Sequence, residues 1–198
     1  MAVSLEEIKK LKELTGVGLT DAKKALEEAN GDFDKALAEM RKKGMTKAEK
    51  RGERSASEGL IEAYVHGSRI GAMVELNCET DFVARTDDFK TLAHDIVMHV
   101  AATNPTYVSA DQIPAQIRDA KAAEFAEKVK NEGKPEAMVP KIVDGMLNKY
   151  FAEQCLMDQP FIKNSDETVS ELVKSHIAKL GENIIVRRIA RFELGVSE

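Results

Sequence analysis

The spacing of apolar residues changes once along this chain, and the change limits what the chain can fold into. Before a charged stretch at residues 45–56, apolar side chains recur every three or four residues; after it, they alternate over residues 60–66 and 70–77. Apolar residues spaced every three or four positions do not fall on one face of a strand, and alternating apolar residues do not fall on one face of a helix. We therefore expect a helical module over residues 1–44, a charged linker helix over 45–56 and a strand-containing part beyond them.

The N-terminal module is expected to be a bundle of three short helices. Ser4 and Glu7 have the spacing of a capping box, Asp32 is placed to cap the third helix, and Gly44 is expected to end it. Helices of roughly ten residues are marginal alone, so each must bury an apolar face against the others.

The rest of the chain predicts an α+β fold with a small antiparallel sheet. Gly67–Ser68 is placed as the turn of a β-hairpin, and helical spacing returns from Phe89 onward. A later helix, which we expect Ser165 or Asp166 to cap, precedes a final strand over residues 183–194. Strands set among helices in this order indicate an α+β core.

Two helices interrupt this core. Helical patterns over residues 111–131 and 136–152 are separated by a short Gly-Lys-Pro connection, which predicts an antiparallel helical hairpin over 111–154. The α+β core is then expected over residues 57–110 and 155–198.

No motif for nucleotide chemistry is present. The sequence contains no GxxxxGK[ST] string, whose backbone amides and lysine would hold phosphates. Gly16-Val17-Gly18 resembles the start of a dinucleotide loop, but Asp21 stands where the third glycine is needed and no strand is expected before it. Direct nucleotide binding and a bound cofactor are not expected.

Histidine and cysteine residues show no metal-site or nucleophile pattern either. His94 and His99 are five residues apart, off a common helix face, and we expect the four histidines to lie at or near the surface. Cys78 lies in an apolar strand, where a packed small side chain is expected rather than a reactive thiol. With no catalytic group in view, the sequence favours a binding or regulatory protein, not an enzyme.

The net charge of −5 hides a basic segment: seven Lys or Arg residues between 41 and 54 face only Glu49 and Glu53. Because no aromatic residues are interleaved with them, we interpret the segment as a solvated helix rather than a nucleic-acid surface. RNA binding through residues 41–54 remains an alternative.

The cellular compartment is expected to be the cytoplasm. The two cysteines are too few for a disulfide framework, which favours a reducing compartment. No apolar run is long enough to span a membrane, and Met1–Glu7 lacks the basic start and apolar stretch of a signal peptide.

One segment between the hairpin and the next helix is unusual for a loop. Thr80-Asp81-Phe82-Val83 carries a large aromatic and a branched side chain where polar residues are normally found. Composition favours a core position for Phe82 beneath the sheet. The alternative is an exposed aromatic beside a carboxylate, which would anchor a protein interface.

The same segment carries a resemblance to a known family. Residues 74–85, VELNCETDFVAR, resemble the signature of the translation elongation factor Ts family, and residues 11–32 resemble its ubiquitin-associated-like N-terminal bundle. HGSRIG at 66–71, QPFI at 159–162 and GENI at 181–184 also resemble blocks of this family. The resemblance extends over nearly the whole chain.

The resemblance implies a guanine nucleotide exchange factor for the GTPase elongation factor Tu. Asp81 and Phe82 would form the tip of a loop fixed by Thr80 and Val83, entering the GTPase near the Mg²⁺ that bridges GDP to that protein. A factor that prefers the nucleotide-free GTPase must lower its affinity for GDP by the same coupling free energy. Such exchange needs no nucleophile.

The resemblance also implies that the N-terminal module docks on the GTPase through Leu11, Val17 and Leu19. Leu11 fits the core of the bundle equally well, and Thr20 stands where many relatives carry an apolar residue. The alternative function is a non-catalytic adaptor that binds proteins through this module.

Oligomeric state follows from a departure from the family pattern. Long members of the family carry two related sheet subdomains. This sequence predicts a single sheet subdomain, which is of the dimerisation type. We therefore expect a homodimer that supplies the missing half, with Cys155 near the interface.

Overall fold

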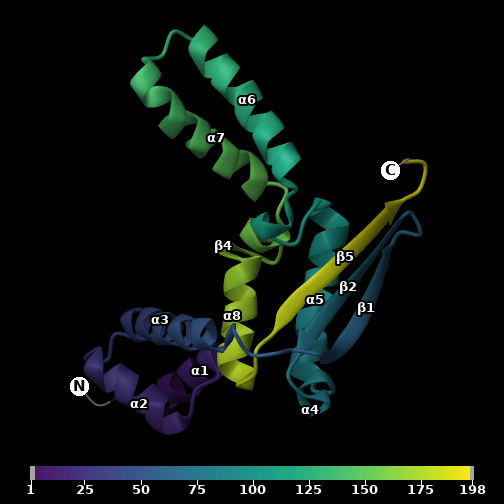
Figure 1. Cartoon of the computed structure of the whole chain (residues 1–198). Helices are drawn as coiled ribbons and strands as arrows, with labels where there is room; N and C mark the ends of the chain where they lie inside the picture. Colours follow the sequence, from purple (N-terminus) through teal and green to yellow (C-terminus); the bar gives the residue numbers. More distant parts are fainter. Residues whose placement is uncertain (1–2, 197–198) are drawn as a thin grey trace.

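The computed structural model describes residues 3–196, with the side chain of Lys47 left aside. The expectation that Met1–Glu7 is not a signal peptide concerns two residues, Met1 and Ala2, that lie outside the described residues. Figure 1 shows a helical bundle at the N-terminal end, a sheet with a helix along one face, a helix between these parts, and a projecting helical hairpin. This arrangement confirms the predicted α+β fold.

The N-terminal bundle contains α1 (Leu5–Thr15), α2 (Leu19–Glu28) and α3 (Phe33–Arg51). The capping box of Ser4 and Glu7 is present, and the Asp32 side chain accepts a hydrogen bond from the Lys35 N–H, as the sequence indicates. The three helices enclose an apolar cluster of their own, formed by Ile8, Leu11, Ala22, Ala25, Leu26, Ala29, Ala36 and Met40.

The third helix does not end at Gly44, as was expected, but continues to Arg51. Its second half packs on α8 (Val169–Leu180): Ala48 is buried in the main core, and the Arg51 guanidinium donates to the Ile177 carbonyl at 3.1 Å. A Cβ on Gly44 would lie 3.3 Å from that of Ala178, so glycine permits this close approach. The expected third helix and linker helix are therefore one element.

The sheet is formed by β1 (Glu58–His66), β2 (Ile70–Cys78) and β5 (Ile185–Glu193). Within residues 3–196 its strand order is β1-β2-β5, and both neighbouring pairs are antiparallel. The predicted hairpin and final strand are confirmed. The inner face of the sheet packs against α5 (Asp87–Thr103), as Figure 1 shows.

The main core lies between this sheet, α5 and α8. Its fully buried side chains alternate along the strands and follow a helical period in α5, which is the pattern that the sequence shows. They include Val74, Leu76, Phe89, Leu92, Ile96, Val97 and Val100.

The helix α8 is capped by Thr168, not by Ser165 or Asp166. Thr168 and Glu171 form a capping box there. Ser165 and Asp166 lie instead in strand β4 (Asn164–Thr168), which pairs with β3 (Pro160–Phe161), so their extended backbone cannot begin the helix.

The projecting hairpin consists of α6 (Ala115–Asn131) and α7 (Val139–Ala152), with short 3-10 turns η1 (Ala110–Gln112), η2 (Glu136–Met138) and η3 (Leu156–Asp158) around it. Its apolar residues form another separate cluster, which includes Cys155 at the base of the hairpin. Cys155 is fully buried, and an isolated β-bridge pairs its backbone with that of Tyr107. Its thiol is therefore not on a surface where a partner could reach it.

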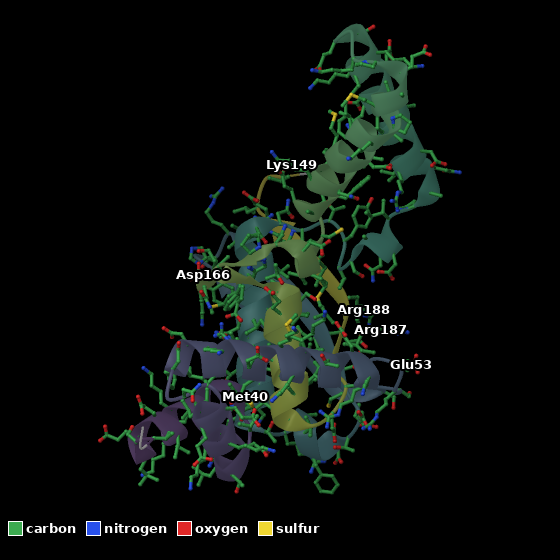
Figure 2. The ribbon with its side chains drawn as sticks, turned by 90° about the vertical axis from the view of Figure 1, so that its left-hand side faces the viewer. Met40, Glu53, Lys149, Asp166, Arg187 and Arg188 are labelled. Carbon is green, nitrogen blue, oxygen red and sulfur yellow. The ribbon has the colours of Figure 1, made fainter. Side chains whose placement is uncertain are left out.

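Figure 2, turned by 90°, shows how the exposed charges are spread over these parts. Lys149 lies on the projecting hairpin and Asp166 on β4, whereas Glu53, just beyond α3, lies on the same side as Arg187 and Arg188 of β5. No helix within residues 3–196 is both long enough and apolar enough to cross a lipid bilayer.

His99 departs from the expected surface position, because it is fully buried. Its Nε2 lies 2.8 Å from the Gln159 Oε1, and its Nδ1 lies 3.2 Å from the Ile162 backbone nitrogen. The Ile162 N–H must donate to Nδ1, so Nε2 carries the proton and the ring is neutral. Burial lowers the pKa of His99, against the opposing effect of the hydrogen bond to Gln159.

We expect His99 to make the protein less stable in mild acid. Its pKa is lowered in the folded state, so below the ordinary histidine pKa of about 6.5 the unfolded chain takes up a proton that the folded chain refuses. The free energy of unfolding should therefore fall as pH falls through this range, by at most about 1.4 kcal/mol per pH unit. Urea denaturation at several pH values measures this slope, and His99→Gln should reduce it; an unchanged slope would contradict the assignment.

Candidate functional site

The segment that joins the hairpin to the next helix is a single helical turn rather than a loop. Strand β2 ends at Cys78, and α4 (Asp81–Ala84) begins after Thr80. The Val83 N–H donates to the Thr80 hydroxyl oxygen at 3.4 Å, so Thr80 caps this turn. Figure 1 shows α4 at one end of the sheet, beyond the start of α5.

Phe82 is the exposed tip of this turn, with 78% of its surface accessible. The core position favoured by composition is therefore wrong. Ala84 is buried and Val83 packs against the main core, so these two side chains occupy the inner side of the turn and Phe82 points away from it. A large exposed aromatic on a fixed backbone is a typical anchor of a protein interface.

Asp81 lies beside Phe82 and remains accessible. Its carboxylate pairs with the Arg85 guanidinium at 2.7 Å, one helical turn away, and the Asp81 side chain is 44% exposed. An exposed ion pair of this kind contributes little stability, so either group is free to change partner at an interface.

Cys78, directly before this turn, is a packed residue as predicted. It is fully buried, and its pKa is raised to about 11, first by burial and then by the negative charge of Glu182. A thiol with this pKa stays protonated at neutral pH and is a poor nucleophile.

The N-terminal residues singled out from the sequence separate into core and surface. Leu11 is fully buried in the bundle core, which is the position that the sequence offered as the alternative to docking. Val17 is half-buried against the same core, whereas Leu19, at the start of α2, is 48% exposed. The accessible apolar surface of this turn is therefore mainly that of Leu19.

The last turn of α8 lies beside the end of α1 and the start of α5. A Cβ on Gly16, which ends α1 with a φ of 66°, would lie 2.5 Å from the Cγ of Lys179. Lys179 also forms an ion pair with Asp88 of α5 at 2.6 Å. Figure 1 shows the bundle and α4 toward the same end of α8, with the helical hairpin at the other end.

Sequence reasoning missed a pair of acidic residues that hold α4 in place. Glu182, just after α8, accepts hydrogen bonds from Thr80, and Glu79 accepts one from the Asn183 N–H at 2.7 Å. Both residues lie in strings that resemble blocks of a known family, Glu79 in residues 74–85 and Glu182 in GENI at 181–184, but the sequence analysis gave neither residue a role. Within residues 3–196, no group of three or more His, Cys, Asp or Glu side chains is placed to hold a metal ion.

Comparison with known proteins identifies the family. The sequence profile described as "Elongation factor TS" matches residues 3–196. This chain belongs to the elongation factor Ts family. A protein of Syntrophus aciditrophicus named elongation factor Ts is 52% identical over 196 residues, which are 98% of each chain.

Further relatives agree with this membership. An elongation factor Ts of Moorella thermoacetica is 50% identical, covering 98% of this chain and 96% of its own. One of Thermodesulfovibrio yellowstonii is 45% identical over the whole of this chain and 99% of its own. The elongation factor Ts family is a family of translation factors, so the predicted role in protein biosynthesis stands.

Proposed function

We propose that this member of the elongation factor Ts family is a guanine nucleotide exchange factor that binds elongation factor Tu and promotes release of GDP. The observation that carries the proposal is the exposure of Phe82 on a turn whose Val83 and Ala84 side chains are anchored in the core. Phe82 and Asp81 enter the GTPase near the Mg²⁺ of its nucleotide site, with Thr80 and Val83 holding the turn.

The physical basis of this exchange is competition for the same local structure of the GTPase. Mg²⁺ links the phosphate oxygens of GDP to protein ligands, so displacing those ligands weakens a contact that only the nucleotide-bound state uses. By linkage, the preference of the factor for the empty GTPase equals its reduction of GDP affinity. No covalent step and no cofactor of the factor itself is involved.

The N-terminal bundle provides the second contact in this proposal. Leu19 is exposed at the start of α2, and Val17 lies in the turn before it. Leu11 supports this turn from within the bundle and does not touch the partner. A second contact, on another part of the GTPase, would keep the factor bound while Phe82 acts.

The proposal is tested by release of a fluorescent GDP analogue from elongation factor Tu in excess unlabelled GDP. The wild-type chain should accelerate release, and Asp81→Ala should reduce the acceleration. If the chain binds the GTPase without changing release, the adaptor alternative replaces exchange. If it binds RNA with an affinity that falls steeply with salt, residues 41–54 carry the function instead.

We further propose that a second copy of the chain covers the outer face of the sheet. On this face the opposed residues Ala63, Met73 and Ala190 form an apolar row, and Val65 and Phe192 beside it are more than half exposed. The same face carries an ion pair between Glu75 and Arg188. In a two-fold dimer the same face of each copy would cover the other, so this apolar row would be removed from water in both chains.

We expect Met73→Asp to abolish this dimer, because it places a charge in the middle of the apolar row without disturbing the inner core. Light scattering should give a dimer mass for the wild type and a monomer mass for the variant. Met138→Asp is the control, because Met138 is similarly exposed but lies in the η2 turn of the hairpin. A wild-type monomer that exchanges nucleotide at full rate would remove the dimer proposal.

A further inference from the structure

Glu182 holds the beginning of α4 from a distant part of the chain. Its Oε2 accepts hydrogen bonds from the Glu79 N–H at 3.1 Å and the Thr80 N–H at 3.0 Å, and its Oε1 accepts one from the Thr80 hydroxyl at 2.6 Å. These two N–H groups follow the end of β2, where no neighbouring strand continues the ladder. One carboxylate therefore satisfies the donors that the strand leaves open.

The contact is reciprocal. The Glu79 carboxylate accepts from the Asn183 N–H at 2.7 Å, so each segment supplies an acidic side chain to the backbone of the other. Asn183 is almost fully buried, and its side-chain amide donates to the carbonyls of Gly52 and Arg54. The end of β2 is thus tied to the α8–β5 connection, and this connection to the segment that follows α3.

We call the hydrogen bonds that Glu182 accepts from Glu79 and Thr80 the clamp. The clamp matters because α4, a single helical turn, does not keep its geometry by itself. A single helical turn is unstable alone, since forming the first turn fixes several residues for little hydrogen bonding. Its cap is the Thr80 oxygen, and donation of the Thr80 proton to Glu182 leaves that oxygen free to accept from Val83. The direction in which Phe82 projects therefore depends on Glu182 through Thr80.

We propose that Glu182 is a positioning residue for exchange, which holds the Thr80–Val83 turn in its active geometry before the partner binds. The inference rests on the proposed exchange function. Preorganisation avoids the entropy cost of ordering the turn at the interface, and misplacing a working group by even a small distance is costly in rate. Loss of the clamp should therefore slow nucleotide release more than it weakens docking.

A spectroscopic test does not depend on activity. The chain contains no tryptophan, so Phe82→Trp places a single reporter at the tip of the turn. In this background, Glu182→Ala should lower the steady-state anisotropy of Trp fluorescence, because the turn gains freedom. Glu182→Gln should have a smaller effect, since one amide oxygen can still accept from the backbone.

Glu171→Ala is the matched control. Glu171 lies in the first turn of the same helix, α8, and also accepts hydrogen bonds from a threonine N–H and hydroxyl, those of Thr168. It is separated from α4 by the length of the helix, so its loss should affect stability but leave the anisotropy of the reporter unchanged. Thermal unfolding followed by circular dichroism checks that each variant is folded; if Glu182→Ala is not, Glu182→Gln decides.

The kinetic test uses the chain with Phe82 intact. Glu182→Ala should lower kcat for GDP release by about tenfold, with KM changed much less, whereas Glu171→Ala should leave both near the wild-type values. Unchanged reporter anisotropy, or an unchanged kcat in a folded Glu182 variant, overturns the positioning role. A wild type that does not accelerate release instead refutes the exchange function, while a fall in anisotropy would still show that Glu182 holds the turn.

Discussion

Phe82→Ala should abolish most of the acceleration of GDP release while leaving the fold intact. Removal of a central aromatic anchor from an interface commonly costs about 2 kcal/mol or more, which corresponds to at least roughly thirtyfold in kcat/KM. Because Phe82 is 78% exposed, the same change should alter the free energy of unfolding by less than about 0.5 kcal/mol. Stopped-flow release of a fluorescent GDP analogue and urea denaturation measure the two effects.

The control for this prediction is Leu5→Ala. Leu5 is a similarly exposed apolar residue at the start of α1, away from the Val17–Leu19 turn. It should leave exchange unchanged. A Phe82→Ala variant that exchanges nucleotide like the wild type would show that the exposed aromatic is not the working group, whatever the family membership.

Gly59→Ala should have the largest effect on stability among single methyl additions in the sheet. Gly59 in β1 opposes Asn77 in β2 and has a φ of 149°, and a Cβ there would lie 2.1 Å from the Leu76 carbonyl oxygen. Backbone cannot move aside as a flexible side chain can, so the strands must separate locally. We expect a loss of about 2–4 kcal/mol in the free energy of unfolding.

This variant should also weaken exchange, because the strained pairing lies just before the segment that leads to α4. Gly71→Ala is the control: Gly71 lies in β2 of the same sheet, and a Cβ there meets nothing within 4 Å. Chemical denaturation should place Gly71→Ala within about 0.5 kcal/mol of the wild type. Equal stabilities for Gly59→Ala and Gly71→Ala would contradict the close approach at Gly59.

Local patterns were sufficient to predict most helices and strands. The β-hairpin formed where alternation and a Gly-Ser turn coincide, and α5 formed where apolar residues follow a helical period. The errors fell where a distant contact decided the outcome. Gly44 did not end α3, because packing on α8 stabilises the second half of that helix, and Thr168 replaced Ser165 or Asp166 as the cap because β4 pairs with β3.

The candidate site was predicted in part. The Thr80–Val83 segment was identified by its unusual composition and by resemblance, but composition alone assigned Phe82 to the core. Leu11 matched a docking position of the family and is buried in the bundle. Glu182 was not singled out, because no local pattern shows that its carboxylate meets a backbone about a hundred residues earlier in the chain.

By itself, the sequence determined the α+β class, the helical bundle, the hairpins and the family, because these depend on periodicity, turn residues and motifs that lie within short stretches. Only the tertiary structure decided which apolar side chains remain exposed, since burial depends on what the rest of the chain leaves uncovered. It also decided how α4 is held. The hydrogen bonds between Glu182 and Thr80 form only when the end of β2 and the end of α8 are brought together by the fold.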